Sequence, residues 1–87
     1  MQAYRINNAV IAADIPEEAS ACFLDEIGGP LPAAIIEVHY LTEIFCTDGS
    51  IKTVKERINE ELDARNAWLR MGIPCELHDP FVVGTLK

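Results

Sequence analysis

The chain has 87 residues, a length that suits one domain built on one hydrophobic core. Fourteen acidic residues and seven basic ones give a net charge of −7, so nucleic-acid phosphates and anionic membranes repel it. No apolar run could span a bilayer, and no basic segment followed by an apolar one opens the chain. We therefore expect a cytoplasmic protein with a single domain, residues 1–87, that binds neither nucleic acid nor membrane.

The start of the chain predicts a strand hairpin. Ala3–Ile6 and Ala9–Ala13 are short apolar runs of the kind found in strands. Asn7 and Asn8 separate them, and asparagine tolerates the left-handed backbone conformation that a tight turn needs. The two strands should therefore pair antiparallel.

A first helix is predicted to begin at Pro16, because proline lacks only an N–H that the first turn leaves unpaired. Glu17 and Glu18 favour the positive end of the helix dipole. Asp14 is expected to contribute to capping the helix, because Ile15, which follows it, is a poor N-cap residue. Gly28 and the glycine that follows end the helix. The expected buried face consists of Ala19, Cys22, Phe23 and Ile27.

The longest extended run, Ile35–Thr47, is expected to organise the sheet. One of its two alternating phases is mostly apolar, which is typical of a strand with one buried face. Thirteen residues is long for one strand, so a bend is expected near Leu41–Thr42. Asp48 and Gly49 then supply a tight turn that folds Ser50–Thr53 back as the next strand.

Thr53 and Glu56 have the spacing of a capping box, which predicts a second helix that runs to about Met71. Gly72 and Pro74 mark its end. Its expected apolar side, interrupted by Arg65, consists of Val54, Ile58, Leu62, Trp68 and Leu69.

Phe81–Val83, which is aromatic and β-branched, is the last predicted strand. The element order is then β-β-α-β-β-α-β. We expect an α+β fold in which two helices pack on one face of a small, largely antiparallel sheet. Small sheets leave open edges, so a homodimer formed through a strand edge is a further expectation.

Acidic residues gather in and just before the first helix. Adjacent helical side chains point about 100° apart, so neighbouring carboxylates there do not form a shared acid–base pair. One interpretation is a solvated surface, and the other is a face that binds a protein partner with a basic surface. The candidate partner-binding residues are Asp14, Glu17, Glu18, Asp25 and Glu26.

Three cysteines, an odd number without a C-x-x-C spacing, argue against a disulfide framework and indicate reduced, buried side chains. Cys75 and His78 have metal-ligand spacing, which Cys46 and His39 would have to complete. Only one such pair exists, and Cys46 and His39 fall on opposite strand phases. No metal, cofactor or catalytic residue is therefore predicted. A metal or thiol protein built on Cys75, His78 and Cys46 is the alternative.

Trp68, the only tryptophan, has two interpretations. If it is buried, it anchors the second helix to the sheet. If it is exposed beside Leu69 and Met71, it is an interface anchor, because tryptophan and methionine are enriched in interface cores.

Short segments near the N-terminus carry a resemblance: Tyr4–Asn7, Val10–Ala13 and Pro16–Ala19, followed by Phe23 and Glu26–Gly28. They are similar to the opening of small phage and prophage proteins, and Asp79–Thr85 resembles the C-terminal end of those proteins. The family often has serine or threonine before the proline, where this chain has Ile15. The resemblance implies no chemistry and no site residues, only the setting of a mobile element.

Together these features predict a non-catalytic, acidic binding protein. In the setting of a mobile element, the expected activity is inhibition or modulation of a host protein complex with a basic surface, of the anti-defence or anti-CRISPR type. The second hypothesis is a structural protein that dimerises.

Overall fold

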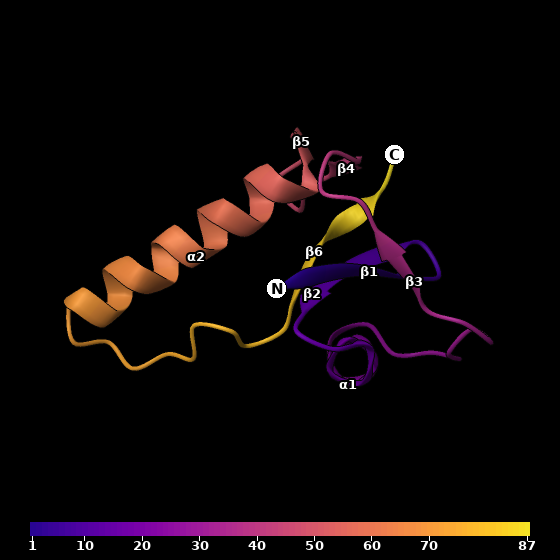
Figure 1. Cartoon of the computed structure of the whole chain (residues 1–87), viewed down its shortest axis with the longest axis horizontal. Coiled ribbons are helices and arrows are strands. Elements are labelled where there is room, and N and C mark those ends of the chain that lie inside the picture. Colours follow the sequence, from indigo (N-terminus) through magenta and orange to yellow (C-terminus); the bar gives the residue numbers. More distant parts are fainter.

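The computed structural model describes all 87 residues. They form a sheet and two helices (Figure 1), which confirms the predicted α+β class. The elements are β1 (Gln2–Ile6), β2 (Ala9–Ala13), α1 (Pro16–Glu26), β3 (Ile36–Val38), β4 (Glu43–Phe45), β5 (Ile51–Thr53), α2 (Val54–Arg70) and β6 (Phe81–Leu86). The strands form one six-stranded sheet in the order β3-β1-β2-β6-β4-β5. Every neighbouring pair in it is antiparallel.

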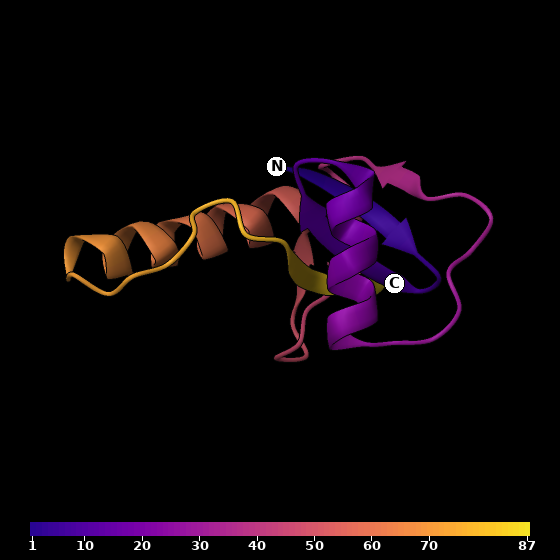
Figure 2. The ribbon, with the colours of Figure 1, turned by 90° about the horizontal axis from the view of Figure 1, so that it is seen from below.

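The two helices cover opposite faces of the sheet (Figure 1, Figure 2), so the expectation that both pack on one face is wrong. All five residues of β2 are buried, which requires cover on both sides. Val10 belongs to a core that includes Val54 and Ile58 of α2. Its neighbour Ile11 belongs to a second core that includes Phe23 of α1. An apolar run without polar alternation is the sequence signal of such a doubly covered strand.

The run Ile35–Thr47 forms two separate strands, so the sheet has one strand more than predicted. The chain turns at Tyr40 and Leu41, close to the expected bend. Its halves then pair at different places, β3 with β1 and β4 with β6. Strand β3 lies at the edge of the sheet, and its Ile36 is 59% exposed and belongs to neither core. The run therefore does not organise the sheet, whose centre is formed by β2 and β6.

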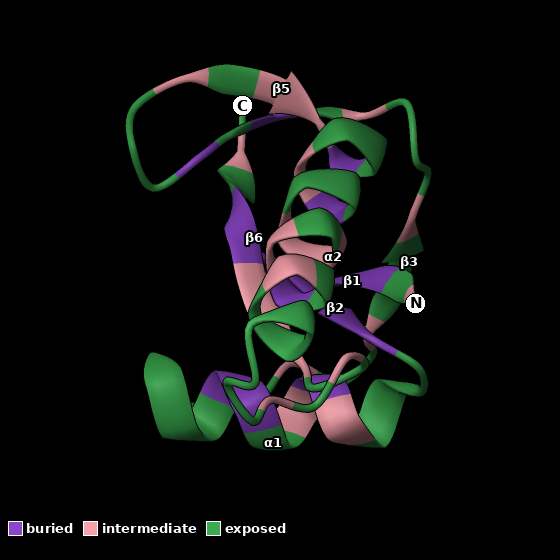
Figure 3. Ribbon diagram, turned by 90° about the vertical axis from the view of Figure 1, so that its left-hand side faces the viewer, coloured by how far each residue is buried: buried purple, intermediate pink, exposed green.

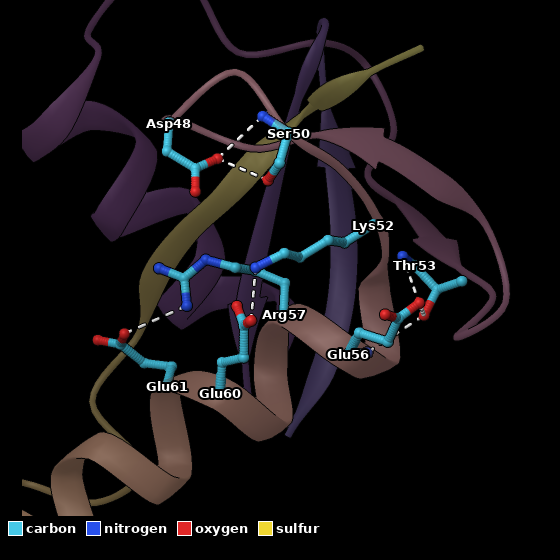
Figure 4. Close-up of polar contacts among 8 residues, drawn as sticks. All are labelled: Asp48, Ser50, Lys52, Thr53, Glu56, Arg57, Glu60 and Glu61. Atoms are coloured by element: carbon cyan, nitrogen blue, oxygen red, sulfur yellow. Dashed lines mark hydrogen bonds and ion pairs between the residues drawn. The ribbon is translucent and has the colours of Figure 1, made fainter.

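The backbone confirms both predicted tight turns. Asn7 has a φ of 54° between β1 and β2, and Gly49 has a φ of 87° between β4 and β5. In the second turn, the Asp48 carboxylate accepts hydrogen bonds from the N–H of Ser50 at 2.9 Å and from its hydroxyl at 2.6 Å (Figure 4). Both hairpins pair antiparallel as expected.

Helix α1 begins at Pro16 as predicted. Its cap residue, Ile15, makes no side-chain hydrogen bond, and Asp14 instead lies near the amino group of Met1. The expected capping by Asp14 is therefore wrong. Ile27 lies just past the last helical residue and is exposed, contrary to the expected apolar face. The predicted residues that are buried are Ala19, Cys22 and Phe23.

Helix α2 begins with the predicted capping box (Figure 4). The Thr53 hydroxyl accepts from the N–H of Glu56 at 3.2 Å, and the Glu56 carboxylate accepts from the N–H of Thr53 at 3.2 Å. The helix ends at Arg70, and Gly72, just past the cap residue Met71, has a φ of 79°. There the N–H of Ile73 donates to the carbonyl of Trp68 at 2.9 Å, which is the bonding expected of a glycine-terminated helix.

Only the first half of α2 packs on the sheet. Val54 and Ile58 are buried there, whereas Arg65 is the one buried residue further along. The second half projects beyond the sheet, and the chain returns along it to reach the central strand β6 (Figure 1), so the molecule measures 41 × 25 × 19 Å. We call residues 62–80 the arm. Neither helix is long and apolar enough to cross a membrane.

Candidate functional site

The side chain of Arg65 makes most of the hydrogen bonds that hold the two parts of the arm together. Its Nε lies 3.5 Å from a carboxylate oxygen of Glu61, and its guanidinium lies over the ring of Phe81, 5.0 Å from the centroid. Its Nη1 donates to main-chain carbonyls of the returning segment at 3.1, 3.0 and 2.7 Å, those of Glu76, Leu77 and Asp79. Because this buried charge is paired and hydrogen-bonded, the arm has a defined structure.

Large apolar side chains are exposed at the end of the arm. Trp68 is 42% exposed and Met71 is 72% exposed, although both belong to the longest helix or its cap. The interpretation of Trp68 as a core anchor is therefore wrong, because the sheet lies beside the first part of α2 and does not reach this part (Figure 1). We call the exposed group Trp68, Leu69, Met71 and Ile73 the apolar tip.

A hollow of about 310 Å³ lies between α1 and the base of the arm, where Asp79 and Pro80 lead into β6. Four carboxylates line it, those of Glu18, Asp25, Glu26 and Asp79. We call these residues the acidic hollow. Asp79 was not predicted as a partner-binding residue, because it lies far from α1 along the sequence. The Arg65 guanidinium brings it there by binding its carbonyl.

The remaining predicted acidic residues lie outside the hollow. The Asp14 carboxylate is 3.3 Å from Nδ1 of His78 and 3.8 Å from the amino group of Met1. Glu17 is exposed in the first turn of α1, away from the lining. The five residues therefore do not form one face; three of them gather around the hollow, and Asp14 joins the arm to the N-terminus.

Cys22 also lines the hollow. Burial raises the pKa of its thiol, and the nearby carboxylates of Glu26 and Asp79 raise it further. A thiol of raised pKa is protonated at neutral pH, and the thiolate is the reactive form. The hollow therefore does not activate Cys22 as a nucleophile.

The residues of the metal alternative are not gathered. Cys46 lies in the core beneath α2. The Cys75 thiol donates to the carbonyl of Arg65 at 3.5 Å, and His78 faces Asp14. No group of three or more histidine, cysteine or acidic side chains is arranged to hold a metal ion. The three cysteines are free thiols, and Cys75 is only half-buried, contrary to the expectation that all are buried.

A scan against protein-family models, a search of curated proteins and a search of solved structures each found no match to this chain. The resemblance to phage and prophage proteins therefore stays a prediction. The functional argument rests on the geometry of the arm, the apolar tip and the acidic hollow.

Proposed function

We propose that this chain is a non-catalytic binding protein that docks on a basic surface of a protein partner. The observation that carries the proposal is the apolar tip at the end of the arm. Several large apolar side chains exposed within one short segment are typical of protein interaction sites. Trp68 and Met71 belong to the residue types that are enriched at the centres of interfaces.

The arm is preorganised for binding in the absence of a partner. Arg65 binds three carbonyls of the returning segment, so the tip is carried by two chain segments joined to each other. The helix end at Gly72 is closed by main-chain hydrogen bonds. Little conformational entropy is then lost when the tip binds, and a preorganised surface binds more tightly than a flexible one.

Charge determines the kind of partner. A chain of net charge −7 is drawn to a basic surface and repelled from an acidic one. The acidic hollow is open to a lysine or arginine side chain of the partner, which would meet the carboxylates of Glu18, Asp25 and Glu26. In this proposal the carboxylates speed and orient the encounter, while the apolar tip supplies most of the affinity.

The biological role follows from the setting that the resemblance implies. A small protein of a mobile element that covers a basic protein surface would block whatever that surface normally binds, including nucleic acid. Inhibition of a host defence complex of the CRISPR type is the specific form that we propose. The physical claim, an acidic protein that docks through the apolar tip, does not depend on that setting.

The test starts with affinity capture from a lysate of the cell that makes the protein, followed by measurement of Kd for the isolated partner. Replacing Trp68 and Met71 by serine should weaken binding at least tenfold, because hot-spot residues each contribute about 2 kcal/mol or more. The control is Ile36→Ser, which removes from the edge strand β3 an apolar side chain whose exposed fraction lies between those of Trp68 and Met71. It should leave Kd unchanged.

A second pair of variants tests the charge. Neutralising Glu18, Asp25 and Glu26 should slow association and flatten its dependence on salt. Neutralising three acidic residues elsewhere alters net charge equally and should have a much smaller effect; suitable positions are Glu37, Glu43 and Asp63.

Three results would contradict the proposal. Equal Kd values for the tip variant and Ile36→Ser would remove the tip from the interface. Equal salt dependence for the two charge variants would remove the acidic hollow. A concentration-dependent dimer that disappears in the tip variant would assign the tip to self-association, which is the structural hypothesis.

A further inference from the structure

The most apolar pocket of the protein lies away from both the apolar tip and the acidic hollow. It has a volume of about 530 Å³, within the range of about 300–1,000 Å³ that small-molecule sites occupy. It lies between the first turns of α2, the segment that joins β3 to β4, and the N-terminus; Figure 3 shows that segment running beside α2. Its apolar lining includes Met1, Leu41, Ile58 and Leu62.

The walls of this pocket are held by hydrogen bonds that need no ligand. The N–H groups of Val54 and Lys55, in the first turn of α2, donate to the carbonyls of Thr42 and Tyr40 at 3.0 Å each. The Tyr40 hydroxyl donates to the carbonyl of Met1 at 2.6 Å. The joining segment is therefore bonded both to the helix and to the N-terminus, and the pocket is formed in advance.

The lining of this pocket carries a positive charge, although the chain as a whole is negatively charged. No carboxylate lines the pocket, although acidic residues outnumber basic ones two to one in the protein. Its charged side chain is Lys55, which takes part in none of the ion pairs of the structure. The other two lysines are both paired, Lys52 with Glu60 and Lys87 with Glu43.

Two further polar side chains supply donors to the same pocket, His39 and Asn59. Nδ1 of His39 accepts the N–H of Leu41 at 3.1 Å, so the proton of the neutral ring is on Nε2, which is left as a donor. The amide of Asn59 adds N–H donors on the next turn of α2 after Lys55. An apolar surface pocket with one unpaired cation and neutral donors matches an anion that carries an apolar body.

The geometry points to a binding site for a small amphipathic carboxylate, a molecule with one carboxylate on an apolar chain or ring. The carboxylate would pair with the ammonium of Lys55 and accept from Asn59 or His39. The apolar part would lie on Leu41, Ile58 and the other apolar lining. This site is separate from the proposed docking surface and holds or fails independently of it.

The test uses octanoate as the probe and octanol as its neutral counterpart, titrated into the ¹⁵N-labelled full chain and followed by amide chemical shifts. Octanoate should shift the amides of residues 39–42 and 55–62 in a saturable manner. Lys55→Gln should weaken octanoate binding about fivefold, as expected for the loss of one exposed ion pair. The matched control Lys52→Gln removes a lysine outside the pocket and should leave it unchanged.

Leu41→Asp is a second variant that does not endanger the fold, because Leu41 is 66% exposed. It places a carboxylate at the pocket and should abolish octanoate binding. The inference is overturned if octanoate causes no saturable shift, if octanol binds as tightly as octanoate, or if Lys55→Gln and Lys52→Gln behave alike. It is also overturned if the same amides shift with protein concentration alone, since a second copy of the chain would then fill the pocket.

Discussion

The guanidinium of Arg65 on α2 donates to the main-chain carbonyl of Asp79 at 2.7 Å, across fourteen positions of the chain. Within the arm, this hydrogen bond joins α2 to the segment that enters the central strand β6. It also sets the position of the Asp79 carboxylate, which borders the acidic hollow beside α1. One arginine therefore connects the part of the molecule that carries the apolar tip with the part that carries the acidic residues.

Replacing Arg65 with methionine should destabilise the protein by about 3 kcal/mol, because three carbonyls lose a donor and Glu61 keeps only one of its two arginine partners, Arg57. Urea unfolding measures the change in free energy. Arg70→Met is the control, since Arg70 is exposed in the last turn of the same helix, and it should change stability by less than about 0.5 kcal/mol. Similar values for the two variants would show that Arg65 does not hold the arm.

Gly84 allows β6 and β4 to approach each other. A Cβ at this position would overlap the main-chain carbonyl of Phe45 on the neighbouring strand. Gly84→Ala should therefore destabilise the protein by about 2–3 kcal/mol and increase hydrogen exchange in β4 and β5. Thr85→Ser, at the exposed position that follows, should stay within about 0.5 kcal/mol of the wild type. Wild-type stability in Gly84→Ala would contradict the β4–β6 pairing.

Hydrogen bonds to Asp48 from the hydroxyl and the N–H of Ser50 lower the pKa of that carboxyl. Because the folded pKa lies below the ordinary value of 3.8, the ionised carboxylate stabilises the turn above that pH. The stabilisation is lost as the pH falls through the folded pKa. A ¹³C NMR titration should give a midpoint below 3.8. Ser50→Ala should raise the midpoint only part of the way towards the ordinary value, since the N–H of residue 50 still donates to the carboxylate. An unchanged midpoint would show that the Ser50 hydroxyl does not lower the pKa of Asp48.

The three thiols should differ in reactivity. Burial, and then the carboxylates around the acidic hollow, raise the pKa of Cys22, so its thiolate forms only above the ordinary value of 9.0. Cys46 is buried in the core, whereas Cys75 is half-buried in the arm. Iodoacetamide at pH 8 should therefore label Cys75 first, as peptide mass spectrometry would show. In Arg65→Met the labelling of Cys75 should be faster still; preferential labelling of Cys22 would contradict the stated pKa shift.

Local signals in the sequence predicted the local structure well. Asn7 and Gly49 produced tight turns, and Thr53 with Glu56 produced a capped helix start, because each of these depends on residues within a few positions of one another. The helix end at Gly72 follows the same logic. These elements need no information about the rest of the chain.

Which strands pair, and which faces of the sheet the helices cover, could not be predicted from local signals. The sequence of β2 is apolar throughout, and an apolar run alone does not say whether one or two faces are covered. The run Ile35–Thr47 has strand character along its length, yet its two halves lie on opposite sides of the sheet centre. Outside the two hairpins, strand partners are chosen by contacts between distant segments, which the residues of one strand do not specify.

The sequence by itself determined where the helices and turns begin and end, the acidic charge and the residues that are able to make contacts. The tertiary structure decided which of those residues meet. In the sequence, Arg65 interrupts an apolar helix face. The carbonyls that accept its hydrogen bonds come from the segment that returns along α2. Trp68 follows the spacing of a buried residue, yet it is exposed because the sheet does not extend that far. The physical reason in both cases is that burial depends on the surface opposite a side chain, which the spacing of residues along one helix does not contain.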